Sequence, residues 1–184
     1  MRLAGHERAP AALFGVAFVE SSVFPIPPDV MLIPMVLAER AKAWRFALIA
    51  TIGSVLGGIA GYAIGFFLLE TVGQALLDFY GYAEKFTQFA GKYNDYGAWI
   101  VLMAGVTPFP YKVITIASGA TQLSFPVFMI ASLVARGLRF YIVTALLYWF
   151  GPPIRDFIER RLGLVTTAFF VSLFGGFLLI KYVL

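Results

Sequence analysis

The sequence predicts an all-α integral membrane protein that forms a single domain over residues 1–184. Hydrophobic residues make up 60% of the chain and charged residues 13%, whereas soluble domains carry roughly 25% charged residues. Mean hydropathy is +0.85. Two proline-broken apolar stretches are each followed by a long apolar stretch. We therefore expect an inverted repeat of two re-entrant helical hairpins, each followed by a transmembrane helix, plus a final transmembrane helix.

The first hairpin is expected over residues 11–38. Each of its apolar limbs is shorter than the about 20 residues that cross a bilayer. The limbs are separated by Pro25, Pro27 and Pro28, and proline lacks a backbone donor and disfavours helix in the residue before it. The chain is therefore expected to enter the membrane, break and turn back, with the break covered by other helices.

A first transmembrane helix is expected over residues 46–69, which carry no charge. Glycine recurs at every fourth position on one face of this helix, and small residues at that spacing let another backbone approach closely. We expect the hairpin to pack on this face. The glycines are Gly53, Gly57, Gly61 and Gly65.

The second half of the chain repeats this order. Charged and aromatic residues alternate over residues 74–95, which suits an amphipathic helix lying at the membrane interface. A second hairpin is expected over 98–120, broken at Pro108 and Pro110. Transmembrane helices are expected over residues 125–150 and 164–183.

The distribution of charge sets the expected orientation. If each hairpin returns to its starting side, the N-terminus and the arginine-rich loops 39–45 and 151–163 share one side. Segment 70–97, on the other side, has more acids than bases. Positive residues favour the cytoplasmic side, so we expect a cytoplasmic N-terminus and hairpins that enter from opposite faces.

Five ionisable residues remain at membrane depth, where each costs roughly 2.5–3.5 kcal/mol on insertion scales. The acids belong to the first half and the bases to the second, so the halves can neutralise each other where they meet. These residues are Glu20, Asp29, Lys112, Arg136 and Arg139.

Each of these residues has a functional and a structural interpretation. Glu20 and Asp29 are predicted to gate transport or carry protons; alternatively, Glu20 pairs with an arginine and Asp29 caps a helix. The three bases are predicted to seat a phosphate, which suits the planar fork of arginine. Alternatively, Lys112 reaches the interface and the two arginines hold the acids in place.

Several function classes are excluded or disfavoured. The absence of cysteine excludes disulfides and thiolate chemistry. The bases lie between apolar segments, where membrane topology explains them, so no nucleic-acid partner is expected. No grouping of nucleophile and base or of metal ligands is recognisable. We therefore expect no enzyme activity, no cofactor and no metal.

Four stretches resemble the DedA family, also known for its SNARE-associated or VTT domain, and are closest to its YqaA-like branch. The resemblance covers nearly the whole chain and implies paired re-entrant hairpins in a bacterial inner-membrane protein. It also implies movement of phospholipids or polyprenyl phosphates between leaflets, in some relatives with the proton-motive force. The stretches are ESSVFPIPPD at 20–29, TIGSVLGG at 51–58, GVTPFPYK at 105–112 and ARGLRF at 135–140.

By the family pattern, Glu20 and Asp29 match acids with a proton-linked role, and Lys112 falls near a basic residue of the second hairpin. Relatives also carry an arginine just before the second hairpin's proline, where this chain has GVT at 105–107. Arg136 and Arg139 are candidates to replace that arginine in space.

The leading hypothesis is a lipid transporter with a phosphate seated between the three bases. Alternatives are a proton-coupled exchanger of small ions or solutes, which needs the same acids but no lipid, and a non-catalytic factor of membrane biogenesis. The glycine-rich faces are compatible with a homodimer.

Overall fold

The structure, a computed structural model, describes residues 8–24, 27–107 and 109–151. All regular structure in this part of the chain is helical, as the sequence predicts. The predicted last transmembrane helix, 164–183, and two of the break prolines, Pro25 and Pro108, lie outside the described residues.

Two short helices, α1 (Ala9–Ser22) and α2 (Asp29–Ala38), occupy the predicted first hairpin. The second pair, α6 (Gly97–Val106) and α7 (Tyr111–Ala120), occupies the predicted second hairpin. Both pairs are interrupted where prolines cluster, because proline cannot donate to the preceding helical turn. Re-entry concerns the bilayer itself, so the re-entrant topology stays a prediction.

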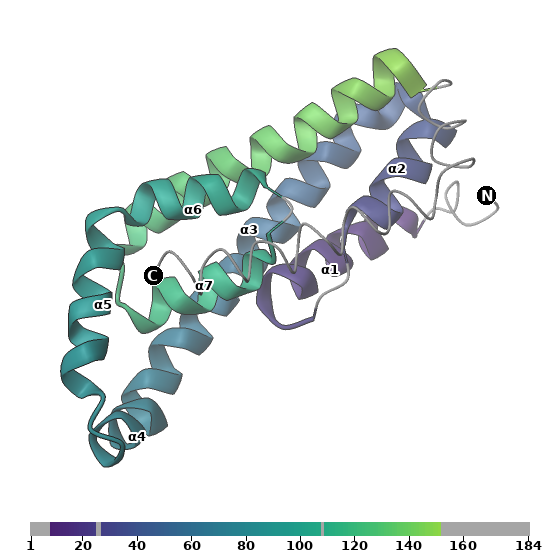
Figure 1. The fold of residues 1–184 in the computed structure, drawn as a ribbon. Helices are drawn as coiled ribbons and strands as arrows, with labels where there is room; N and C mark the ends of the chain where they lie inside the picture. The colour runs from purple at the N-terminus through teal and green to yellow at the C-terminus, as the bar shows by residue number, and fades with distance from the viewer. Residues whose placement is uncertain (1–7, 25–26, 108, 152–184) are drawn as a thin grey trace, which may run out of the picture.

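Among the described residues, two helices are long and apolar enough to cross a membrane. The first begins with a 3-10 turn, η1 (Arg40–Lys42), and continues as α3 (Ala43–Leu68). The second is Phe125–Gly151, which we call the arginine helix because it carries Arg136 and Arg139. It is the light green helix along the upper edge of Figure 1.

The prediction of one interfacial helix over 74–95 is wrong in its boundaries. A π-helical turn, η2 (Leu69–Gly73), joins α3 directly to α4 (Gln74–Phe79), so the first long helix runs from Arg40 to Phe79. Gly81 then takes a φ of 68°, a left-handed conformation that glycine adopts at little cost. That turn reverses the chain into a separate helix, α5 (Ala83–Asp95).

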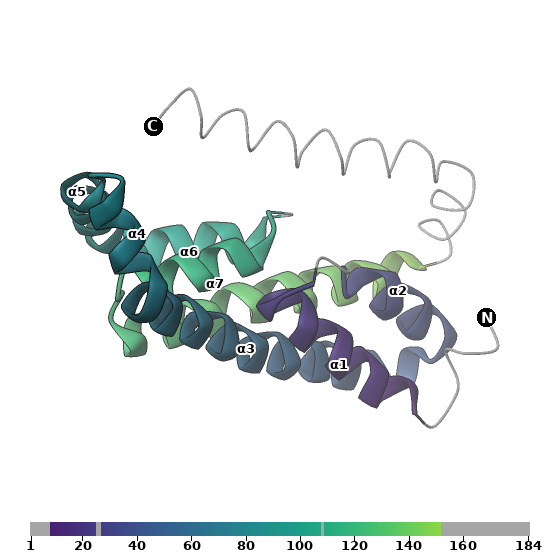
Figure 2. The ribbon, with the colours of Figure 1, turned by 90° about the horizontal axis from the view of Figure 1, so that it is seen from below.

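Each long helix packs against limbs of both hairpins. Along α3, Gly53 and Gly57 face α1, whereas Gly61 and Gly65 face α7. Figure 1 accordingly shows α1 and α7 following one another along α3, and Figure 2 shows the same arrangement from below. A Cβ at Gly53 would lie 2.6 Å from the carbonyl oxygen of Phe14, so the glycines allow contact between backbones.

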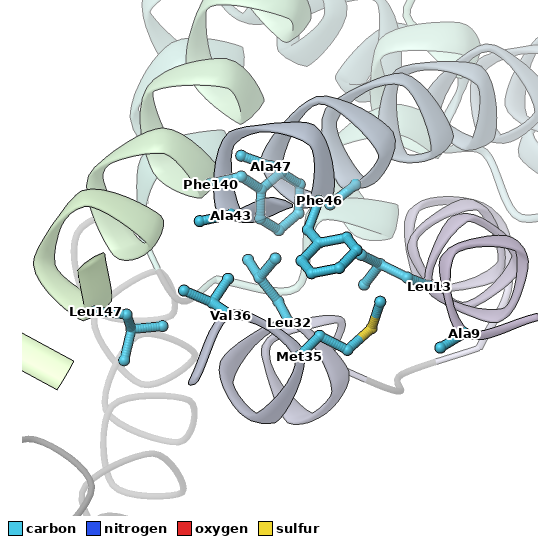
Figure 3. Close-up of a cluster of buried hydrophobic side chains, with 11 residues drawn as sticks. Ala9, Leu13, Leu32, Met35, Val36, Ala43, Phe46, Ala47, Phe140 and Leu147 are labelled. Carbon is cyan, nitrogen blue, oxygen red and sulfur yellow. The ribbon is translucent and has the colours of Figure 1, made fainter. Parts of the chain in front are cut away.

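The arginine helix bridges two separate apolar cores. One core joins α1, α2, the start of α3 and the end of the arginine helix, where Leu32 and Val36 of α2 pack near Phe140 and Leu147 (Figure 3). The other joins α5, α6, α7 and the start of the arginine helix around Phe128. Between the cores lies a group of polar side chains at the hairpin breaks, which we call the polar layer. It comprises Glu20, Ser21, Asp29, Ser54, Arg136 and Arg139.

Candidate functional site

The two hairpin breaks lie next to each other and are joined by hydrogen bonds between the halves of the chain. The last carbonyl groups of a helix have no partner within it. Here Thr115 Oγ1 donates to the Ser21 carbonyl oxygen at 3.0 Å, and Lys112 Nζ donates to that of Val23 at 3.2 Å. Arg139 Nη1 donates to the Thr107 carbonyl oxygen at 2.5 Å. Side chains of the second half thus satisfy backbone groups at both breaks.

The first ion pair of the polar layer joins Glu20 on α1 to Arg136. Arg136 Nη2 lies 2.8 Å from Glu20 Oε2, and their side chains are 2% and 12% exposed. Arg136 Nε also donates to Ser54 Oγ on α3. The guanidinium carbon lies 4.8 Å from the ring centroids of both Tyr111 and Phe140, a cation–π geometry. The Arg136 charge is therefore held from α1, α3, α7 and its own helix.

Buried hydroxyl groups extend this network. Ser21 Oγ lies 2.6 Å from Ser54 Oγ and donates to Glu20 Oε2 at 3.1 Å. Tyr111 Oη donates to Ser132 Oγ at 2.5 Å. None of these hydroxyl residues was predicted to be a site residue. The sequence could have revealed them, because they are isolated polar residues on otherwise apolar or glycine-lined helix faces. Such residues must form hydrogen bonds when they are buried.

The second ion pair joins Asp29 to Arg139, one helical turn further along the arginine helix. Arg139 Nη2 lies 2.6 Å from Asp29 Oδ2, and the side chains are 16% and 21% exposed, respectively. Asp29 Oδ1 and Arg139 Nε are both buried and have no hydrogen-bond partner among the described residues. Asp29 opens α2, and its oxygen Oδ2 binds the arginine rather than a backbone N–H of the first turn.

The predicted charges are thus brought together in part. The acids of the first half contact the arginines of the second, each with its own partner. Lys112 lies at the breaks but joins neither ion pair within the described chain; it holds the Val23 carbonyl. Of the predicted break residues, Pro27 and Pro28 directly precede α2, and Pro110 directly precedes α7.

The site offers charge and hydrogen bonding rather than metal ligation. Across the described residues, no three acidic, histidine or cysteine side chains come together in a way that could hold a metal ion. Partly buried arginine–carboxylate contacts between apolar helices are its main feature. Such charges in a bilayer must be paired, and they mark substrate or ion pathways in membrane proteins.

Two long apolar helices, broken apolar hairpins and a layer of partly buried ion pairs indicate a helical membrane protein. The VTT domain matches residues 26–149. The chain therefore belongs to the VTT-domain, or DedA, family of membrane proteins, and the family prediction is confirmed.

Relatives span most of the chain. An uncharacterized protein of Haemophilus influenzae is 37% identical over 165 residues, which cover 90% of this chain and 85% of the relative. Inner membrane protein YqaA of Escherichia coli is 26% identical over 135 residues, covering 73% and 87%. An uncharacterized protein of Methanocaldococcus jannaschii is 27% identical over 128 residues, covering 69% and 76%. No solved structure matches the chain.

Proposed function

We propose that this protein moves a phosphate-bearing lipid, either a phospholipid or a polyprenyl phosphate, between the leaflets of a bacterial inner membrane. The observation that carries the proposal is the pair of partly buried arginine–carboxylate contacts where two broken hairpins meet. Maintaining four charges there is costly in a bilayer, and a purely structural core of the same volume could be built from apolar residues. A function that needs the charges accounts for them.

The proposed topology is an inverted repeat with a cytoplasmic N-terminus and several membrane passes. It is supported by the way α3 holds α1 from one hairpin and α7 from the other, and by the arginine helix, which contacts α2 and α6 in the same crossed manner. Transporters with inverted repeats place their sites at broken helices near the bilayer midplane. The two breaks of this chain would occupy that position.

In this proposal the cations attract the lipid phosphate and the acids compete with it. Arginine binds phosphate oxygens through two parallel N–H groups, and Lys112 adds a charge at the exposed side of the breaks. Glu20 and Asp29 then gate access or exchange protons as the lipid passes. We propose no enzymatic step, no cofactor and no nucleic-acid partner, and a homodimer is compatible with the fold.

The test is reconstitution of the full chain into liposomes with a leaflet-resolved lipid assay. We expect wild-type protein to accelerate the movement of a phosphate-bearing lipid well above the rate in protein-free liposomes. Arg139→Gln is expected to abolish the acceleration. Arg45→Gln, which removes an exposed cation at the start of α3, is the matched control and should retain it.

Other outcomes select between the alternatives. Acceleration that is equal in wild type and Arg139→Gln would contradict the proposed role of the arginine. Proton or solute flux without lipid movement would favour a small-ion or solute exchanger, which uses the same acids. Folded protein that moves neither lipid nor solute would favour a factor of membrane biogenesis.

A further inference from the structure

The two ion pairs lie one helical turn apart but differ in how completely they are satisfied. Arg136 is 2% exposed, and its guanidinium contacts a carboxylate, a hydroxyl group and two aromatic rings. These partners come from three other helices or their ends and from the arginine helix itself. Removing any of them would leave a buried charge poorly paired, which proteins tolerate badly. A ligand could reach Arg136 only after this packing is dismantled.

Arg139 is in a different state. Its side chain and that of Asp29 are several times more exposed than the side chain of Arg136. The pair forms one short contact, and an oxygen of Asp29 and a nitrogen of Arg139 remain buried without a partner among the described residues. Buried polar atoms without partners carry a desolvation penalty. The closed pair is therefore less favourable than its short contact suggests, and it is easier to open.

Arg139 also connects the two breaks. One of its terminal nitrogens holds Asp29, which directly follows the first break, and the other holds the Thr107 carbonyl, which precedes the second break. Glu20 and Arg136, in contrast, link the body of α1 to the arginine helix. Release of Arg139 would remove one contact at each break, with Asp29 and with Thr107, while Glu20–Arg136 keeps α1 attached.

We infer that the two ion pairs have different roles. Glu20–Arg136 is a permanent brace that holds the hairpin to the arginine helix. Asp29–Arg139 is a latch, which opens when the phosphate of the transported lipid displaces the Asp29 carboxylate from Arg139. This inference rests on the proposed function and narrows it. Of the charges proposed to act on the lipid, Arg139 contacts the phosphate and Asp29 competes with it, whereas Glu20 and Arg136 are assigned a structural role.

The latch predicts an unusual binding result, because removing an acid from its arginine should help a competing anion. The full chain is purified in a zwitterionic detergent and titrated with dihexanoyl phosphatidic acid, and thermal stabilisation gives the affinity. Asp29→Asn keeps the shape of the side chain and removes its charge. It should bind the probe roughly three- to tenfold more tightly than wild type, where a tenfold change corresponds to about 1.4 kcal/mol. Arg139→Gln should lose binding.

The Glu20–Arg136 pair should respond differently from the Asp29–Arg139 pair. Glu20→Gln should lower the unfolding temperature without tightening binding, whereas Asp29→Asn should change the unfolding temperature little. Glu39→Gln is the matched control, because it neutralises a more exposed carboxylate, 33% accessible, that pairs with Lys42 at 2.7 Å; it should change neither quantity. If Arg139→Gln does not fold, Arg139→Lys keeps the charge without the planar fork and should bind more weakly than wild type.

Weaker binding in Asp29→Asn, equal tightening in Glu20→Gln or no binding by wild type would each overturn the latch. Inorganic phosphate is titrated in parallel: if it binds as tightly as the lipid, the latch stands and its ligand is a free phosphate rather than a lipid. A wild type that binds with the predicted pattern yet moves no lipid would keep the latch and refute the proposed transport.

Discussion

The two long helices hold the same two hairpins by opposite means. α3 presents glycines, so that the backbones of α1 and α7 lie directly against it. The arginine helix presents long side chains, and its Arg136 and Arg139 reach out to α1 and α2. α3 supplies close packing without charge, and the arginine helix supplies the two cations.

This difference shows how a charged layer is maintained inside an apolar protein. Close packing on α3 fixes the position of α1, and therefore of Glu20, independently of any electrostatic contact. Arg136 can then meet the carboxylate in a fixed geometry, which is what a buried ion pair needs to offset its desolvation cost. The packing of α1 on α3 thus positions Glu20, and Arg136 of the arginine helix neutralises it.

Disrupting the glycine packing between α3 and α7 should have the largest effect. A Cβ at Gly65 would overlap the Ile116 carbonyl of α7, and backbone cannot move aside as a flexible side chain can. Gly65→Leu should therefore prevent correct folding, measured as loss of monodisperse protein after purification. Gly15→Leu is the control, since nothing lies within 4 Å of a Cβ there; comparable loss in both variants would contradict the account.

Disrupting the Glu20–Arg136 ion pair should have the second-largest effect. Arg136→Gln leaves Glu20 buried without its cation, and breaking a buried pair in this way typically costs about 3–5 kcal/mol. Thermal unfolding in detergent measures the loss, which the double variant Arg136→Gln/Glu20→Gln should partly recover. Glu39→Gln, at the more exposed pair with Lys42, should cost at most about 1 kcal/mol. An equal loss at both sites would show that burial of the Arg136 pair carries no special weight.

The contact between the two long helices can be probed with a smaller change. Ser54 of α3 accepts a hydrogen bond from Arg136 and lies 2.6 Å from Ser21 Oγ. Ser54→Ala should cost about 1.5–3 kcal/mol, the range for hydrogen bonds to charged groups, in the same unfolding measurement. The exposed Thr87, which bonds within its own helix, is the control: Thr87→Ala should be near neutral, and a larger loss there than at Ser54 would be inconsistent with the network.

The sequence was sufficient to predict the elements whose signals are local. Prolines mark both interruptions, and the uncharged glycine stripe identifies α3 as a packing helix. The opposite signs of Glu20 and Arg136, in different halves of an apolar chain, predict that the halves meet, because neither charge can stay alone in lipid.

Other features depend on three-dimensional contacts that no local pattern encodes. The assignment of Arg136 to Glu20 and of Arg139 to Asp29 follows from how the helices are offset, and both arginines lie on the same face three residues apart. The continuation of α3 into α4 was missed because Glu70 and Gly73 resemble the end of a helix. The role of Ser54 was missed because a serine among glycines on an α-helix is equally compatible with simple close packing.

The proposed topology places both hairpin breaks together within the bilayer. The chain has no cysteine, so a single spin label can be attached at Val23→Cys or at Phe109→Cys, and its immersion depth in liposomes measured from collisions with oxygen and with a water-soluble relaxant. Labels at Arg45→Cys and Tyr80→Cys provide references near opposite membrane surfaces. We predict that positions 23 and 109 lie at similar depth, and deeper than both references. A label at headgroup depth at either position would show that this break does not lie within the bilayer.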